Sequence, residues 1–321
     1  MNLVEAPVAT KIVSEADIGA RVDLYAFQQF PEFLCSRSRS RKSTKNGFVR
    51  VNGEVVESGR VLTLGDRVDV FRPPPLGARK VFPIHIRVLF EDECMALVYK
   101  PPGILTNGNR FRTLENALTH NLTPTTASDA LAWPRPVHRL DRATQGIVVV
   151  AKTQSAEIHL NRQFQLRTVA KTYRAIVGGR LEGGGTVSSA IEGRNAVTRW
   201  RSVSVNRSLR TQWMSTVVLY PHTGRTHQLR RHMSLLGHPI SGDVLYGVKG
   251  ATHRGKGLFL CAQAVELAHP KTGERLRMDV EEPEKFASHR ARQERRWRKF
   301  FGAHHSWLLQ GVVDTGMADK S

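Results

Sequence analysis

Three consecutive prolines, Pro73 to Pro75 in the stretch PPPLG, limit how this chain can fold. Such a run cannot join an α-helix or a central β-strand, because proline lacks the backbone N–H that both use. It therefore predicts a linker between two folding units. We expect a small module at residues 12–75, a larger domain at residues 80–287 and a basic C-terminal tail at residues 288–321.

The module at residues 12–75 has the pattern of a small α+β fold. In FVRVNGEVV, Asn52-Gly53 separates two short β-branched runs, which is a strong signal for a type I′ hairpin. A further strand is expected in LTLGDRVDVF, after the Gly65-Asp66 turn. The basic stretch SRSRSRKSTKNG precedes the hairpin.

The larger domain shows several strand patterns. One strand, in FEDECMALVYK, should stop at Pro101-Pro102, and the continuous apolar run GIVVVAKT predicts a buried strand. Further strands are expected in KTYRAIVGG and QWMSTVVLYP, with GGRLEGGG as a turn after the first of them.

Two helices are predicted in this domain. The first follows GIVVVAKT, with Ser155 as its N-cap, and the second covers RTHQLRRHMSLLGH and ends at Gly237. The apolar residues at helical spacing are Ala156, Leu160 and Phe164 in the first, and Leu229, Met233 and Leu236 in the second.

The charge of the chain indicates a polyanionic partner. It has 48 Lys and Arg against 28 Asp and Glu, which gives a formal net charge of +20 and a pI near 10.6. Nucleic acid is the first candidate and an acidic membrane surface the second. The membrane alternative is weaker, because no apolar run approaches the roughly 18 residues that span a bilayer.

Cysteine usage and the first residues indicate the compartment. Cys35, Cys94 and Cys261 are scattered, which argues against a disulfide framework or a cysteine zinc site. The start, MNLVEAPVATKIV, lacks the basic and apolar regions of a signal peptide. We therefore expect a cytoplasmic protein.

The segment HRLDRATQG contains one carboxylate among cations. Asp141 lies between Arg139 and Arg142 in a strongly basic chain. One interpretation is structural, because charged clusters often only perturb one another. The other is a nucleophile held ionised by a guanidinium group. This segment alone leaves both open.

Two further segments, KTYRAIV and HTGRTHQLRRHMSLLGHPISGDVLYG, favour the second interpretation. In this order and spacing, the three segments resemble the pattern of the RluA-type pseudouridine synthases, which is close to HRLDxxTSG, KxYxA and TGRTHQIRxHxxxxGxPIxGDxxYG. The resemblance covers nearly the whole larger domain. The module at residues 12–75 resembles, more loosely, the small RNA-binding domain first seen in a ribosomal protein of the small subunit.

The resemblance implies a fold and a reaction. The fold is α+β, with a long mixed, mostly antiparallel central sheet and the active-site cleft across its middle. The enzyme detaches uracil from its ribose, rotates it and rejoins it through carbon five, without a cofactor. The target uridine is expected to flip out of the RNA into the cleft.

The resemblance also assigns three catalytic residues. Asp141 matches the family's essential aspartate, and Arg230 matches the arginine that pairs with it. Tyr173 matches the tyrosine that stacks on the target base, and its hydroxyl is a candidate for removing the proton from carbon five. Arg230, rather than Arg139 or Arg142, is thus the expected partner of Asp141.

A wider set of residues is expected to contact the RNA. Leu260 falls where the family has an apolar pocket residue, although Gly257 and Cys261 replace the usual Arg and His nearby. Gln145 likewise stands where Ser is usual, so the subfamily and target stay open. The other expected substrate-binding residues are Arg139, Arg142, Lys100, Arg37, Arg39 and Arg41.

Competing functions are weaker. The histidines near these motifs lack zinc spacing and GGRLEGGG is not a phosphate loop, so we expect neither a metal nor a nucleotide cofactor. His138 and His227 are expected to form hydrogen bonds around the site. The expected substrate is large-subunit ribosomal RNA, with transfer RNA second and a monomer as the expected state. The alternatives are a non-catalytic RNA-binding ribosome-assembly factor and a DNA-binding protein.

Overall fold

The computed structural model describes residues 6–34, 36–71, 81–247 and 255–310, and the side chains up to residue 301. The PPPLG linker, Cys35 and the C-terminal DTGMADKS lie outside these residues. The domain boundaries proposed at residues 75 and 80 therefore stay predictions. Within the described part of the chain, no helix is both long and apolar enough to cross a membrane.

Residues 6–71 form a four-stranded antiparallel sheet with two α-helices. The elements are β1 (Ala9–Ile12), η1 (Glu15–Asp17), α1 (Val22–Gln29), α2 (Arg37–Lys45), β2 (Val49–Val51), β3 (Glu54–Val55) and β4 (Arg67–Val70), with the strand order β1-β4-β2-β3. Asn52 (φ 54°) and Gly53 (φ 84°) connect β2 to β3, which confirms the predicted hairpin. Its buried core includes Val22, Tyr25, Phe30, Val49 and Val68.

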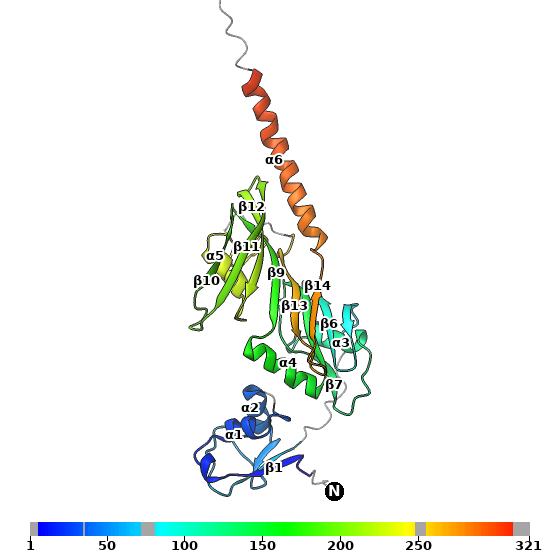
Figure 1. The fold of residues 1–321 in the computed structure, drawn as a ribbon, viewed down its shortest axis with the longest axis vertical. Coiled ribbons are helices and arrows are strands. Elements are labelled where there is room, and N and C mark those ends of the chain that lie inside the picture. Colours follow the sequence, from blue (N-terminus) through cyan, green and yellow to red (C-terminus); the bar gives the residue numbers. More distant parts are fainter. Residues whose placement is uncertain (1–5, 35, 72–80, 248–254, 311–321) are drawn as a thin grey trace, which may run out of the picture.

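The rest of the chain is built on one ten-stranded sheet (Figure 1). Its main path is β10-β11-β12-β9-β13-β8-β6-β5, while β14 pairs with β13 and β7 with β8. The strands are β5 (Arg87–Glu91), β6 (Met95–Lys100), β7 (Ala130–Pro136), β8 (Gln145–Thr153), β9 (Ala170–Gly178), β10 (Gly184–Ser188), β11 (Val197–Ser208), β12 (Gln212–Pro221), β13 (Leu260–Ala268) and β14 (Arg275–Asp279). β8 and β13 run parallel and the other pairs antiparallel. The predicted mixed, mostly antiparallel sheet is confirmed.

The helices of this part are α3 (Leu114–Asn121), α4 (Gln154–Leu166), α5 (Gln228–Leu235) and α6 (Glu284–Gln310). β8 is buried along its whole length, with apolar clusters on both faces, as its continuous apolar run predicts. β6 ends at Lys100, just before the predicted proline stop. The strand predictions in KTYRAIVGG and QWMSTVVLYP are also confirmed, as β9 and β12.

Two details of the helices differ from expectation. Thr153, not Ser155, is the N-cap of α4, since its hydroxyl accepts a hydrogen bond from the N–H of Ala156. On α5, Leu229 and Met233 are buried, but Leu236 is 37% exposed because it lies past the last helical residue. Gly237, with a φ of 79°, follows the helix as predicted.

α6 begins before the predicted tail and points away from the sheet at its far end (Figure 1). Its first turns pack on the body of the protein, since Phe286 is fully buried and lies 5.4 Å from the Phe259 ring. Further along, Trp297 lies near the Arg207 guanidinium, which also stacks on Trp213 at 3.6 Å. The start of the tail therefore covers the sheet.

Candidate active site

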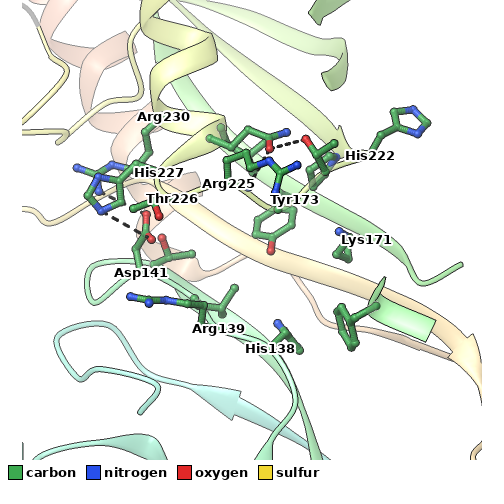
Figure 2. Close-up of a pocket in the computed structure, with 18 of the residues that line it drawn as sticks. His138, Arg139, Asp141, Lys171, Tyr173, His222, Arg225, Thr226, His227 and Arg230 are labelled. Carbon is green, nitrogen blue, oxygen red and sulfur yellow. Dashed lines mark hydrogen bonds and ion pairs between the residues drawn. The ribbon is translucent and has the colours of Figure 1, made fainter. Parts of the chain in front are cut away.

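A cavity of about 470 Å³ opens between the middle of the sheet and α5. The loop before β8, the first half of β9, the end of β12, α5 and the start of β13 all supply its walls. Five residues predicted for the site line it: Asp141, Tyr173, Arg230, Leu260 and Arg139. Three segments far apart in the sequence thus meet at one place, as Figure 2 shows.

The loop that carries Asp141 is held in place by hydrogen bonds to the loop that follows β6. Thr106 exchanges two hydrogen bonds of 3.0 Å with the backbone of Leu140. The N–H of Gly103 donates to the carbonyl of Arg142, whose side-chain Nε donates back to Gly103 O at 2.9 Å. This reciprocal pairing fixes where the Asp141 carboxylate points.

Lys100 belongs to this support rather than to the surface, so its predicted place on the RNA-facing side is wrong. It is fully buried, and its ammonium donates to the carbonyls of Pro101, Ile104 and Arg142. Burial lowers its pKa to about 8, against a smaller opposing effect of the Asp141 charge. Lys100 therefore positions the Asp141 loop from inside the protein.

Gly146 allows β8 to approach β13 just behind this loop. It has a φ of 123°, and a Cβ there would lie 2.2 Å from the carbonyl oxygen of Ala262. Any side chain would push β13 away from β8, where Gly146 pairs with Ala262. The glycine thus keeps Leu260 and Asp141 on the same cavity.

Two basic side chains approach the Asp141 carboxylate. Arg230 Nη1 lies 3.4 Å from Oδ2, and His227 Nε2 lies 3.8 Å from Oδ1. Arg139 lines the cavity without an ion pair to Asp141, and Arg142 is committed to Gly103. The predicted pairing across 89 residues is therefore present, while the sequence neighbours do not supply it.

Asp243 fixes the guanidinium of Arg230. The two side chains are buried and form a bidentate pair, with Nε–Oδ2 at 2.7 Å and Nη2–Oδ1 at 2.8 Å. Burial lowers the pKa of Arg230, but the hydrogen bonds and charge of Asp243, with a smaller effect of Asp141, raise it overall. Arg230 thus stays cationic, and its Nη1 is left to face Asp141.

The turn after α5 supports both Arg230 and His227. Asp243 Oδ1 also accepts from the N–H groups of Leu245 and Tyr246, which closes the turn. The Tyr246 hydroxyl lies 3.0 Å from His227 Nδ1, so this ring is held by Tyr246 while its other nitrogen faces Asp141. His227 is a hydrogen-bonding residue of the site, as predicted.

Asp243 and Tyr246 are the residues whose roles the sequence reasoning missed. Both lie in the GDVLYG part of the third motif, so their presence in the pattern was visible. The sequence around Asp243 does not indicate that its partner is Arg230, however, because this pairing depends on the turn that follows α5. Gly242 permits that turn, since a Cβ there would lie 1.9 Å from the Gly257 carbonyl oxygen.

Tyr173 belongs to β9, which lies between β12 and β13 in the sheet. Its side chain lines the same cavity as Asp141 (Figure 2). Burial raises the pKa of its phenol above the usual range, and the negative charge of Asp141 raises it further. The hydroxyl is therefore protonated while Asp141 carries its charge. The apolar wall beside the ring includes Leu260 of β13, which lines the cavity as expected.

His138 is a neutral scaffold residue on the opposite wall. Its Nε2 accepts a hydrogen bond of 3.0 Å from the N–H of Val149, and its ring stacks on Phe164 at 4.7 Å. Burial, helped by the nearby charge of Lys171, lowers the pKa of His138 to about 3. Protonation would remove the acceptor that β8 uses, so the folded protein holds this ring neutral.

We expect His138 to make folding sensitive to mild acid. Between pH 6 and 4 the unfolded histidine binds a proton that the folded one refuses, so stability is full above about pH 6.5 and falls as the pH drops toward 3. The slope is at most about 1.4 kcal/mol per pH unit. Urea unfolding at pH 6, 5 and 4 should show a flatter dependence for His138→Gln. His120→Gln, an exposed control on α3, should keep the wild-type slope; equal slopes in all three proteins would exclude His138 as the cause.

The basic run of the module forms α2, which lies beside α4 (Figure 1). Arg37 and Arg41 are exposed, one turn apart. Arg39 is half-buried and pairs with Glu157 of α4 at 3.0 Å, so it joins the module to the sheet domain. The three arginines therefore do not form one uniform surface.

One group of the described residues has the composition of a metal site: Asp92, Cys94 and His269. They lie at the ends of β6 and β13 opposite the cavity. The Nδ1 atom of His269 accepts from the N–H groups of Lys271 and Thr272, which leaves the ring proton on Nε2, donated to Asp92 at 2.6 Å. A metal would need that same nitrogen deprotonated, so the geometry fits a hydrogen bond between His269 and Asp92 that links the two loops.

Comparison with known proteins agrees with the three-motif pattern. A family model described as RNA pseudouridylate synthase matches residues 95–235. An uncharacterised RNA pseudouridine synthase of Aquifex aeolicus is 35% identical over 294 residues, covering 84% of this chain and 92% of that protein. A protein named ribosomal large subunit pseudouridine synthase D, from Xanthomonas campestris, is 35% identical over 309 residues, covering 85% and 88%.

The fold comparison gives the same result. The solved structure of human RNA pseudouridylate synthase domain containing 1 aligns with a TM-score of 0.52 and 26% identity, covering 64% of this chain and 86% of that one. Sequence relatives over most of the chain, the shared fold and the meeting of the motifs at one cavity agree. The chain belongs to the RNA pseudouridylate synthase family and is an RNA pseudouridine synthase.

Proposed function

We propose that this enzyme isomerises specific uridines of large-subunit ribosomal RNA, with Asp141 as the nucleophile and without a cofactor. The observation that carries the mechanism is the Asp141 carboxylate, held between Arg230 and His227 in a cavity that also contains Tyr173. The substrate class rests on relatives named for the large ribosomal subunit and on the net charge of +20.

Asp141 is positioned to act on a uridine flipped into the cavity. The bond from N1 to the ribose carbon C1′ breaks, the uracil rotates, and a bond from carbon five to C1′ forms. A carboxylate can attack the sugar, add to the base, or assist elimination to a glycal intermediate, and each route needs it ionised. The Arg230 and His227 side chains lie beside the carboxylate, at 3.4 and 3.8 Å from its oxygens.

Tyr173 supplies the platform and the last proton transfer in this proposal. Its ring lines the cavity beside Leu260, where a base can stack. The oxygen of this hydroxyl then takes the proton from carbon five while the hydroxyl's own proton passes to water, so the phenol is neutral before and after the step. Burial is the main reason why the phenol pKa is raised, and the negative charge of Asp141 adds to it; a covalent bond at Asp141 would remove that second contribution, so this step becomes easier once the intermediate has formed.

The RNA backbone would lie over the basic surface near the cavity and the module. Arg139, at the cavity rim, and exposed Arg142, Arg37 and Arg41 are its candidate contacts. Arg39 can contribute only from its pair with Glu157. We infer a monomer acting in the cytoplasm, where the ribosomal RNA of bacteria such as the source of the relatives is made.

The proposal is tested with RNA carrying tritium at carbon five of uridine, because rejoining through that carbon releases tritium to water. Wild-type protein is incubated with large-subunit ribosomal RNA transcripts and, separately, with transfer RNA transcripts. Release from ribosomal RNA alone is the expected result. Release from transfer RNA alone would transfer the activity to the runner-up substrate, and release from neither would overturn the proposed function.

A further inference from the structure

A second cavity, of about 350 Å³, opens directly beside the first. The two share four wall residues: Arg167, Lys171, Pro221 and His222. Figure 2 shows Lys171 and His222 on the side of Tyr173 away from Asp141. A chain that enters the first cavity can therefore continue past Tyr173 into the second. The volume is within the range of small-ligand pockets.

The seam between the cavities, formed by the four shared wall residues, carries positive charge without a counter-ion among the described residues. Neither Arg167 nor Lys171 forms an ion pair with any described residue. Burial lowers the pKa of Lys171, and the neighbouring charge of Arg167 lowers it further. An anion placed at the seam would relieve this repulsion, which is what a phosphate group offers.

The far wall of the second cavity offers a stacking surface. Tyr220, near the end of β12, lies under the Arg199 guanidinium at 4.9 Å from the ring centre, and both line the cavity. An aromatic ring and an arginine plane are the groups on which unpaired bases stack. The one acid of this wall, Glu266, is neutralised by ion pairs with Arg275 and Arg277.

We propose that this second cavity binds the nucleotide next to the target uridine. Its phosphate lies at the seam, against Arg167 and Lys171, and its base stacks on Tyr220 beside Arg199. The inference rests on the proposed function, since it needs a uridine in the first cavity. It also gives a reason why the target uridine stays flipped out of the RNA. The neighbouring base, which loses its stacking within the RNA, stacks on the protein instead.

Steady-state tritium release from the large-subunit ribosomal RNA transcript tests the proposal. Arg199→Gln and Tyr220→Leu should each raise KM roughly tenfold, as the loss of one stacked base would, while kcat stays within about twofold. Arg167→Gln should also flatten the logarithmic salt dependence of RNA binding by about 0.7, because it removes one phosphate contact. Tyr220→Leu should leave that slope unchanged, because it removes no charge.

Two controls make the result specific. Tyr220→Phe keeps the ring and should behave as the wild type. Arg162→Gln removes the same charge from an exposed position of α4 that lines neither cavity, and it should leave KM unchanged. Thermal melting of each variant separates lost binding from lost folding.

The outcomes distinguish the two proposals. If the wild type releases tritium and the Arg199 and Tyr220 variants keep its KM, the second cavity does not hold the neighbouring nucleotide, although the proposed function stands. If the wild type itself releases no tritium from any RNA, the proposed function fails first. A fall in kcat at unchanged KM would instead make these residues part of the first cavity's chemistry.

Discussion

Asp141→Asn is expected to lower the rate of tritium release on the order of 10⁴-fold or more, the scale seen when a nucleophile is removed from an enzyme. The amide has nearly the shape of the carboxylate, but it is a poor nucleophile and carries no charge. Affinity for ribosomal RNA should stay within a few fold, because the phosphate contacts lie elsewhere. Single-turnover tritium release and filter binding measure the two quantities.

The fold should survive this substitution. Arg230 keeps its bidentate partner Asp243, and Asp141 itself is on a loop held by Thr106 and Gly103 through backbone atoms. Asp129→Asn is the matched control, since Asp129 caps the first turn of α4 away from the cavity and an amide oxygen can do the same. An Asp141→Asn protein that keeps a hundredth of the wild-type rate would remove Asp141 from the role of nucleophile.

The sequence predicted well those elements whose signal is local. β8 and β12 are apolar runs, and the Asn52-Gly53 hairpin has a backbone conformation that those residues favour. Element ends were less certain: Thr153 and Ser155 are both good caps, and only the residue at which β8 stops decides between them. The pairing of Asp141 with Arg230 was available through the resemblance alone, because nothing local links residues so far apart.

The misses concern contacts between distant segments. Lys100, ahead of two prolines, has the pattern of an exposed strand end, yet it is buried because the loops after β6 and before β8 present three carbonyl groups to it. Asp243 is similar, because its role depends on an ion pair with the Arg230 guanidinium, which α5 supplies. Both are buried charged residues that hold the surroundings of Asp141 in place without lining the cavity. They were missed because a charged residue in a sequence usually indicates an exposed position.

Arg230→Met is expected to have two separate effects. Tritium release should fall about 10²- to 10³-fold, as when one preorganised donor is lost from an active site. The free energy of unfolding should also fall by about 3 kcal/mol or more, because the fully buried Asp243 carboxylate would be left without its counter-ion. Urea unfolding and single-turnover kinetics measure these effects independently.

The double variant Arg230→Met/Asp243→Asn separates the two effects. It removes the buried charge together with its partner, while an amide oxygen can still accept from the N–H groups of Leu245 and Tyr246. Most of the lost stability should therefore return, since a buried ion pair and its neutral replacement are often nearly equal in stability. Activity should not return, because no cation would replace Arg230 beside Asp141. A stable double variant with restored turnover would show that Arg230 serves the fold alone, whereas one as unstable as Arg230→Met would show that the loss comes from packing rather than from an unpaired Asp243.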